Sequence, residues 1–283
     1  MSTLPSKKDK IFESPYQCSV AIIGVGYVGL PIVYALSKTK LCPKTHEKIN
    51  HQIIAYDIDE SRIEELKKGI DRTKELGEEK LKNLKNVIFT TQTNTLHSAN
   101  IFIITVPTPI DKNNNPDLKS LEMACILVGK VLKNRIQKNK IYPIIIFEST
   151  VFPGATEEFC VPLIENESQL RLNIDFFVGY SPERINPGDK NKSIIDIVKV
   201  TSGSSKKSGL WINTFYSGII TAGTHLAPNI KTAEAAKVIE NTQRDINIAF
   251  MNELEMIFDK MDINFKLVRQ AAKTKWNFID FYP

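Results

Sequence analysis

The chain of 283 residues has little cysteine, and its four cysteines follow no metal-binding or disulfide pattern. They stand at positions 18, 42, 125 and 160, with no Cys-x-x-Cys spacing and no companion histidines. Zinc sites and disulfide frameworks depend on such spacing. We therefore expect no metal site and no disulfide framework, and we expect the cysteines to be small buried hydrophobic residues.

Long apolar runs and blocks of like charge are also absent. No segment approaches the ~20 apolar residues that a membrane span needs, and residues 1–17 contain lysines but no apolar signal core. We expect a cytoplasmic protein with no membrane partner. The formal net charge is +5, yet lysines alternate with acidic residues and no run of five like charges occurs. This pattern favours a solvated basic surface and no nucleic-acid partner.

What the sequence does contain is a series of short, unbroken apolar segments rich in β-branched and aromatic residues. Six of them begin at Cys18, Ile53, Val87, Ile101, Pro143 and Asp175. Stretches with helical spacing lie between them, for example at 61–68 and 118–132. Buried strands that alternate with helices are typical of a parallel sheet covered on both faces. The prediction is an α/β fold with a Rossmann-like doubly wound parallel sheet.

A different pattern begins after Gly223. From 230 to 261, apolar residues recur every three or four positions without a glycine or proline, which predicts one helix of about thirty residues. Helices of this length link domains or pair with a second copy. We divide the chain into a polar tail at 1–17, an α/β domain at 18–224 and a helical dimerisation and substrate region at 225–283.

A glycine-rich turn follows the first predicted strand and opens a predicted helix. Its pattern is Gly-x-Gly-x-x-Gly, at Gly24, Gly26 and Gly29. Here Gly24 permits a tight turn, Gly26 lets the backbone approach a pyrophosphate, and Gly29 allows close helix packing. N–H groups at the helix N-terminus can then bind phosphate oxygens. The turn predicts a dinucleotide site, and a chance cluster of glycines is the alternative.

Asp57 stands at the end of the second predicted strand. Its carboxylate can accept hydrogen bonds from ribose hydroxyls and would repel a 2′-phosphate, which favours NAD over NADP. The separation of Asp57 from Gly29 exceeds the usual ~20 residues. We assign the excess to a polar insertion at 39–51.

Three further segments follow predicted strands and should lie at the carboxyl edge of the sheet, where ligands bind. Residues 105–109 (Thr-Val-Pro-Thr-Pro) and 148–154 (Glu-Ser-Thr-Val-Phe-Pro-Gly) suit rigid loops near a nicotinamide, and structural turns explain them equally well. Residues 181–189 offer Glu183, which could poise a water, and Arg184, which could clamp phosphate or carboxylate.

Three polar residues lie on one face of the long predicted helix. Lys237, Asn241 and Arg244 are spaced at i, i+4 and i+7, so they project toward one spot. From spacing alone a solvated stripe is the better interpretation.

Together these motifs resemble those of the UDP-sugar 6-dehydrogenases, in order, from about Cys18 to the last residue. The matching features also include Arg62 after the strand that ends at Asp57. Residues 69–73, the pair Arg184 and Pro187, and residues 274–277 are similar to the branch that acts on UDP-N-acetylhexosamines. The resemblance implies an NAD-dependent enzyme that makes UDP-N-acetylhexosaminuronic acid for surface polysaccharides.

The resemblance also implies roles for individual residues. Contacts with NAD are implied for Gly24, Gly26, Tyr27, Val28, Gly29, Asp57, Arg62, Thr108 and Thr150. Contacts with the UDP-N-acetylhexosamine substrate are implied for Arg184, Ile185, Lys237, Asn241 and Arg244. Catalytic roles are implied for Glu183, Lys237, Asn241 and Thr150. In this scheme Glu183 handles water and protons, Lys237 stabilises oxyanions at C6, and Asn241 holds the same oxygen or the water.

One part of the family pattern is not found. The resemblance places the nucleophilic cysteine in a Gly-Gly-x-Cys motif beyond the segment that corresponds to 276–283, followed by a UDP-binding domain. None of the four cysteines here has that context, and Cys160 is expected to be a packing residue. We expect a truncated dehydrogenase that binds NAD without completing the reaction. The alternatives are a non-catalytic NAD-binding module, part of a split protein, and, less favoured, a hydroxyacid dehydrogenase.

Overall fold

The computed structural model describes residues 12–84, 86–134, 141–185 and 193–282. The first eleven residues of the expected polar tail, and Asn186, Pro187, Gly188 and Asp189 of the 181–189 segment, lie outside the described residues. The chain divides into two units, Met1–Ala235 and Ala236–Pro283. In the described part, no helix is both long and apolar enough for a membrane span.

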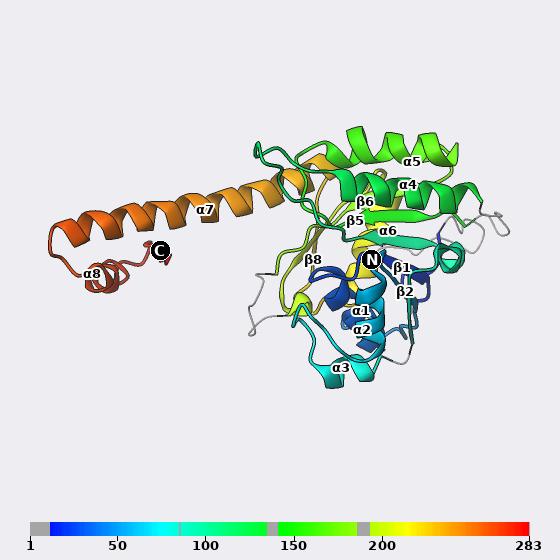
Figure 1. The fold of residues 1–283 in the computed structure, drawn as a ribbon, viewed down its shortest axis with the longest axis horizontal. Helices are drawn as coiled ribbons and strands as arrows, with labels where there is room; N and C mark the ends of the chain where they lie inside the picture. The colour runs from blue at the N-terminus through cyan, green and yellow to red at the C-terminus, as the bar shows by residue number, and fades with distance from the viewer. Residues whose placement is uncertain (1–11, 85, 135–140, 186–192, 283) are drawn as a thin grey trace. The chain divides into compact units, whose positions relative to one another are not determined.

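The first unit is built on a six-stranded parallel sheet in the order β3-β2-β1-β4-β5-β6 (Figure 1). The strands are β1 (Ser19–Ile23), β2 (Gln52–Tyr56), β3 (Val87–Thr90), β4 (Ile101–Ile104), β5 (Ile144–Phe147) and β6 (Phe177–Tyr180). The strand order reverses between β1 and β4, the switch point at which open α/β sheets bind ligands. The six predicted strands and the doubly wound α/β class are confirmed.

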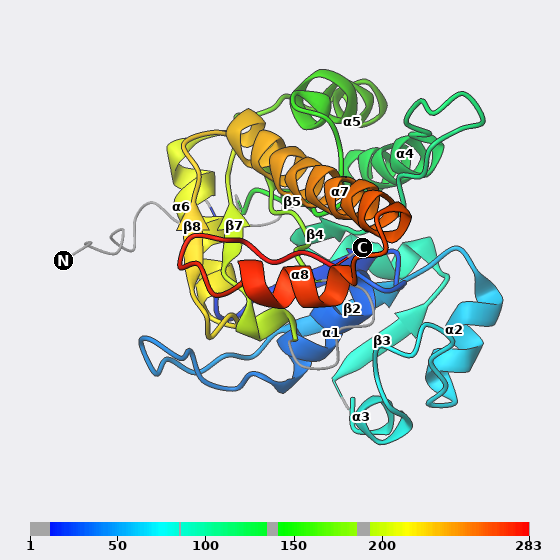
Figure 2. The ribbon, with the colours of Figure 1, turned by 90° about the vertical axis from the view of Figure 1, so that its left-hand side faces the viewer.

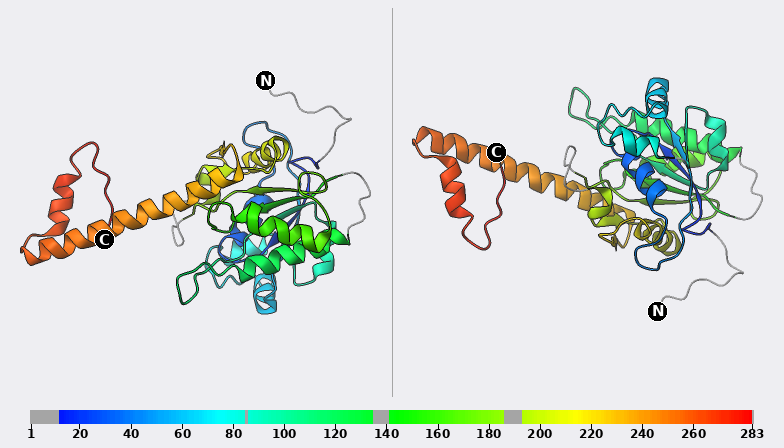
Figure 3. Two further views of the ribbon diagram at one scale, coloured as in Figure 1. Left: turned by 90° about the horizontal axis from the view of Figure 1, so that it is seen from above. Right: turned by 90° about the horizontal axis from the view of Figure 1, so that it is seen from below.

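Helices cover both faces of this sheet. One face packs against α1 (Gly29–Lys38), α2 (Glu60–Lys67) and α6 (Lys206–Ser217), and the other packs against α4 (Lys119–Lys133) and α5 (Val161–Ser168). Figure 1 shows α1 and α2 below the sheet with α4 and α5 above it, and Figure 3 shows α4 and α5 side by side. Successive residues of a strand point to opposite faces of the sheet. Because helices cover both faces, successive residues must be apolar.

The close approach of α1 to β1 depends on two glycines. Gly24 has a φ of +93°, which favours glycine, and a Cβ on Gly29 would lie 2.0 Å from the carbonyl oxygen of Gly24. The Thr105 hydroxyl, at the end of β4, donates to that carbonyl oxygen at 2.6 Å. Gly24 and Gly29 are therefore sterically required where the first strand turns into the first helix.

Several elements of the first unit were not predicted. They are the helices α3 (Glu78–Lys82) and α6, the 3₁₀ turns η1 (Thr93–Ser98) and η3 (Ile194–Asp196), the π-helical turn η2 (Thr156–Cys160), and the strands β7 (Lys199–Thr201) and β8 (Thr224–Leu226). Strands β7 and β8 pair with each other beside α6 (Figure 2). Serine hydroxyls connect β7 to β6: Ser181 Oγ donates to the Val200 carbonyl at 2.7 Å, and Ser202 Oγ donates to the Tyr180 carbonyl at 2.8 Å.

Helix α7 (Ile230–Lys260) agrees with the long helix predicted at 230–261, and its residues from Ala236 onward belong to the second unit. That unit also contains α8 (Phe265–Ala272). The chain after α8 is held by Asp280, which forms ion pairs with Arg269 at 2.8 Å and Lys273 at 2.9 Å. The Arg269 guanidinium also lies 3.8 Å from the centre of the Tyr282 ring.

All four cysteines are buried, as expected of small hydrophobic residues, and their thiols are free. Cys18 Sγ lies 3.3 Å from His51 Nδ1, at the start of the paired strands β1 and β2. Burial raises the pKa of the Cys18 thiol well above its ordinary value and lowers the pKa of His51 to about 4. His51 Nε2 is buried and has no hydrogen-bond partner within the described part of the chain, so the neutral imidazole is part of the core.

We predict that His51 makes the first unit sensitive to mild acid. Its pKa in the folded chain, about 4, lies below the ordinary histidine value of 6.5, so the unfolded chain binds the proton more readily. Stability is therefore complete above pH 6.5 and falls by about 3 kcal/mol as the pH drops to 4. Urea unfolding followed by Trp211 fluorescence, in a Trp276→Phe background, measures this change.

The matched variants are His51→Leu and His225→Leu, because His225 is exposed. His51→Leu should remove most of the loss of stability between pH 6.5 and pH 4, whereas His225→Leu should retain it. An equal acid sensitivity in the two variants would contradict the prediction.

Candidate functional site

The turn between β1 and α1 forms an open surface at a helix N-terminus. A Cβ on Gly26 would meet no atom within 4 Å, so the backbone there faces open space. No side chain caps α1 at Val28, and its first turn has no acidic residue. Tyr27 is 54% exposed beside the turn. The N–H groups at the start of α1 and the open space beside them fit a pyrophosphate group.

Asp57, directly after β2, is held beside this turn. Its Oδ2 accepts a hydrogen bond from the Val25 amide at 2.9 Å, and its Oδ1 accepts one from the Asp59 amide at 3.0 Å. A carboxylate oxygen can accept more than one hydrogen bond, so both oxygens retain acceptor capacity for a ribose diol. The turn and Asp57 together fit the adenosine and pyrophosphate portions of NAD.

Arg62, expected to contact NAD, supports the same turn from a buried position. Its Nε donates to the Val25 carbonyl at 3.0 Å, and its Nη2 lies 2.8 Å from Asp71 Oδ1. Burial by itself would raise the pKa of Asp71, but hydrogen bonds from Thr73, Leu76 and Arg62 lower it below its ordinary value. Arg62 Nη1 is buried with no hydrogen-bond partner among the described residues. Its contact with NAD stays a prediction.

The two hydroxyl-bearing segments expected at the carboxyl edge are joined there. Thr108 Oγ1 donates to the Thr150 carbonyl at 2.6 Å, and Ser149 Oγ donates to the Val106 carbonyl at 2.6 Å. These bonds connect the loop after β4 with the loop after β5. The structure thus brings Thr108 and Thr150 together at the edge where ligands bind.

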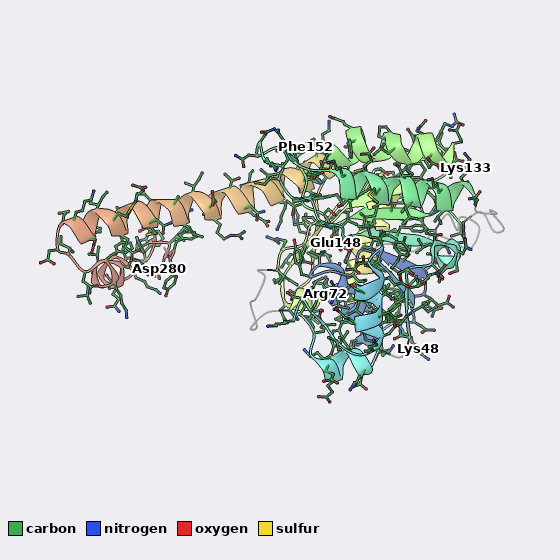
Figure 4. The ribbon with its side chains drawn as sticks, viewed as in Figure 1. Lys48, Arg72, Lys133, Glu148, Phe152 and Asp280 are labelled. Carbon is green, nitrogen blue, oxygen red and sulfur yellow. The ribbon has the colours of Figure 1, made fainter. Side chains whose placement is uncertain are left out.

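The first residue of the loop after β5 enters a buried cluster of charges. Glu148 lies inside the first unit (Figure 4), where its Oε2 is 2.5 Å from Lys199 Nζ and its Oε1 accepts a hydrogen bond from the Tyr216 hydroxyl. The pKa of Glu148 is raised, chiefly by burial. Burial would lower the pKa of Lys199, but Glu148 and Glu183 raise it and keep the ammonium charged.

Glu183 follows β6 and lies near the same ammonium. Its Oε1 accepts hydrogen bonds from the amides of Arg184, at 2.6 Å, and Ile185, at 2.7 Å, and its Oε2 lies 3.6 Å from Lys199 Nζ. The Arg184 guanidinium donates to the Val198 carbonyl at 2.7 Å. The structure therefore ties three of the predicted site residues into one loop at the end of β6.

The remaining predicted site residues lie on α7 in the second unit. Arg244 Nη2 donates to Asn241 Oδ1 at 3.1 Å, so two of the three residues adjoin on one helix face. Lys237 lies one turn before Asn241 on the same helix. The roles of all three in substrate binding and catalysis stay predictions.

Three of the residues that organise this site received no role from the sequence: Asp71, Lys199 and Tyr216. The sequence could have indicated a buried charge at Lys199, because this lysine stands between two valines at the start of the short strand β7. Such a charge must be paired if the strand is buried. Its partner, Glu148, is distant in the sequence, so the pairing itself had no sequence signal.

Glu234, near the start of α7, was also missed. This fully buried residue accepts hydrogen bonds from the amides of Gly154, at 2.6 Å, and Thr156, at 2.9 Å. It thereby holds the end of the loop that carries Thr150.

We predict that Glu234→Gln lowers the free energy of unfolding of the first unit by about 2 kcal/mol. A glutamine side chain has one acceptor oxygen, so one of the two amides would lose its partner in a buried position. Denaturant unfolding measures the change, with Glu253→Gln as the control because Glu253 is exposed on the same helix. Equal stability of the two variants would refute this role of Glu234.

Comparison with known proteins agrees with the fold and the motifs. Residues 18–220 match the NAD binding domain of the UDP-glucose/GDP-mannose dehydrogenase family, and residues 231–283 match its central domain. A UDP-N-acetyl-D-glucosamine 6-dehydrogenase from Pseudomonas aeruginosa is 50% identical over 264 residues, 93% of this chain and 58% of that protein. A UDP-N-acetyl-D-mannosamine dehydrogenase from Campylobacter jejuni is 31% identical, over 90% of this chain and 60% of that protein.

A solved structure gives the same result. The UDP-D-ManNAc dehydrogenase from Pyrococcus horikoshii has a TM-score of 0.79 at 29% identity, covering 94% of this chain and 60% of that one. The chain therefore spans less than two thirds of the length of these relatives. With both family domains matched in order, the chain belongs to the UDP-glucose/GDP-mannose dehydrogenase family, and residues 18–220 are its NAD binding domain.

Proposed function

We propose that this chain is the cofactor-binding and central part of a dehydrogenase that oxidises C6 of a UDP-N-acetylhexosamine to the uronic acid. The product would serve surface polysaccharide biosynthesis. The observation that carries the proposal is the open glycine turn with Asp57 fixed beside it, in a chain that is 50% identical to a UDP-N-acetyl-D-glucosamine 6-dehydrogenase. The N-acetylhexosamine class rests on that relative's name.

The proposed cofactor site lies at the carboxyl ends of β1, β2, β4 and β5. Bound NAD would supply the hydride acceptor. The glycine turn would bind the pyrophosphate through main-chain amides, and Asp57 would bind the adenosine ribose. Thr108 and Thr150, joined by a 2.6 Å hydrogen bond, would line the nicotinamide half.

The proposed substrate residues are on the loop after β6 and on α7. Arg184 and Ile185 would contact the sugar nucleotide, as would Lys237, Asn241 and Arg244. Glu183 would handle water and protons, with Thr150 near the reacting carbon. Lys237 would stabilise oxyanions at C6, where charge develops in the transition state, and Asn241 would hold the same oxygen or the water.

The second oxidation step in our proposal needs a cysteine nucleophile outside this segment. All four cysteines here are buried. Burial raises the pKa of the Cys18 thiol, and a hydrogen bond with Cys125 together with burial raises the pKa of Cys160, so the nucleophilic thiolate is disfavoured at both. We propose that the chain alone binds NAD without completing the four-electron reaction. A non-catalytic NAD-binding module, or part of a split protein, is the alternative.

Calorimetry with the Gly26→Val variant tests the cofactor site. The unaltered chain should bind NAD with a dissociation constant between about 1 μM and 1 mM. The added side chain should weaken binding at least about 100-fold because it would occupy the open space above the turn. It should leave stability within about 1 kcal/mol, since a Cβ there meets no atom within 4 Å.

The control is Gly77→Val, which also places its Cβ in open space and lies outside the proposed cofactor site. It should bind NAD normally. Undiminished binding by Gly26→Val would refute the site. In the same preparation, UDP-N-acetylglucosamine and NAD should yield no sustained uronic acid, and steady four-electron turnover would contradict the proposed need for an outside cysteine.

We also propose a homodimer through the helix at 230–261. Within the second unit, α7 exposes Ile239, Ile246, Phe250 and Ile257, which are spaced so that they share one helix face. An exposed apolar stripe of this kind is typical of a protein interface.

Light scattering tests the dimer. The 32.0 kDa chain should have about twice that mass in solution. Phe250→Glu should shift it to monomer because a charge would be buried in the interface, whereas Asn252→Glu, on a different helix face, should not. A strictly monomeric mass at high concentration would exclude the dimer.

A further inference from the structure

A single buried ammonium lies between carboxylates that come from two loops of the candidate site. Lys199, 2% exposed on β7, has its Nζ 2.5 Å from Glu148 Oε2 and 3.6 Å from Glu183 Oε2. Glu148 opens the loop after β5, and Glu183 is in the loop after β6. Lys199 belongs to neither loop but to β7, which pairs with β8 and is connected to β6 by two serine hydroxyls.

The two carboxylates are satisfied in different ways. Glu148 Oε1 accepts a hydrogen bond from the Tyr216 hydroxyl, so Glu148 is bonded through both oxygens. Glu183 Oε1 accepts hydrogen bonds from two main-chain amides, whereas its buried Oε2 has no hydrogen-bond partner among the described residues and lies 3.6 Å from the ammonium. The Glu183 side chain is 11% exposed, so water screens its charge only slightly.

The net charge of Lys199, Glu148 and Glu183 together depends on the Lys199 ammonium. If both carboxylates are ionised, the three groups carry a net charge of −1 in a nearly dry environment. A further titratable group bears on Glu183: Glu75, whose raised pKa is due mainly to burial, with contributions from Asp71 and Glu183. Without the ammonium, Glu183 and Glu148 would face each other as buried like charges, which is strongly unfavourable.

We propose that Lys199, anchored by Glu148 and Tyr216, is a positioning residue that holds Glu183 in its ionised form with Oε2 oriented for reaction. This rests on the function proposed above, in which Glu183 handles water and protons. A carboxylate accepts a proton from water only when it is itself unprotonated. Lys199 would thus act through Glu183 without contacting substrate.

Infrared spectroscopy of the ligand-free chain at pH 7 tests the proposal. Protonated and ionised carboxyl groups absorb at different frequencies, and ¹³C-labelled glutamate separates Glu bands from Asp bands. The double variant Glu148→Gln/Lys199→Met should show one protonated glutamate per chain that the unaltered protein lacks. Adding Glu183→Gln should abolish that band and so assign it to Glu183.

The double variant is chosen because Lys199→Met alone leaves two facing buried carboxylates and can unfold the chain. Replacing both members of a buried ion pair by neutral residues of similar size is often tolerated, and circular dichroism checks the fold of each variant. Glu148→Gln alone, which keeps the ammonium beside Glu183, should show no protonated band. Lys199→Arg, which keeps the positive charge, should show none either.

Lys231→Met is the matched control for loss of a lysine. Lys231 pairs with Glu158 at 2.6 Å on the surface, where both side chains are more than half exposed, so water should keep Glu158 ionised. A folded double variant in which Glu183 stays ionised would overturn the proposal. Because this measurement uses neither cofactor nor substrate, its failure is distinct from failure of the proposed function, which calorimetry with NAD tests.

Discussion

The rest of the structure depends on the close packing of α1 against the end of β1. Only a hydrogen at Gly29 fits beside the Gly24 carbonyl, from which a Cβ would be 2.0 Å away. The same carbonyl accepts the Thr105 hydroxyl at 2.6 Å, which links the end of β1 to the end of β4 across the switch point. This packing aims the amides of the first turn of α1 at the edge of the sheet, where a phosphate group can bind. The position of the cofactor site thus follows from a steric constraint.

Around that point, side chains from distant parts of the sequence fix the loops that extend from the carboxyl edge. Neutral hydroxyls make some of these connections: Thr108 bonds to the Thr150 carbonyl, and serines attach β7 to β6. Buried charges make the others. Glu234 holds the loop after β5 through two amides, and Lys199 pairs with Glu148 and lies near Glu183. Buried charges are tolerated only when partnered, so these loops are constrained to geometries that keep the pairs together.

The six strands of the main sheet and the helix of 230–261 were predictable from the sequence because apolar periodicity is a local property. A strand buried on both faces must be apolar at successive positions, as at Ile101–Ile104. Strand β7 lacks this signal, because one of its three residues is a lysine, and it was not predicted. Its structure comes from packing against the rest of the unit, which overrides weak local preference. Helix α6 was missed although Trp211, Ile212, Phe215 and Tyr216 have helical spacing.

By itself, the sequence determined the doubly wound class, the glycine turn and the placement of Asp57, because each depends on residues close together in the chain or on a strand end. It also determined that the loops after β4, β5 and β6 share one edge, since parallel strands end together. Only the tertiary structure decided which groups meet there. Three contacts join residues that are separated by long stretches of chain. They are the ion pair of Lys199 with Glu148, the hydrogen bond of buried Arg62 to the Val25 carbonyl, and the hydrogen bond of Glu234 with the Gly154 amide. Such contacts arise from three-dimensional packing and from the need to neutralise buried charge, and neither leaves a pattern in neighbouring residues.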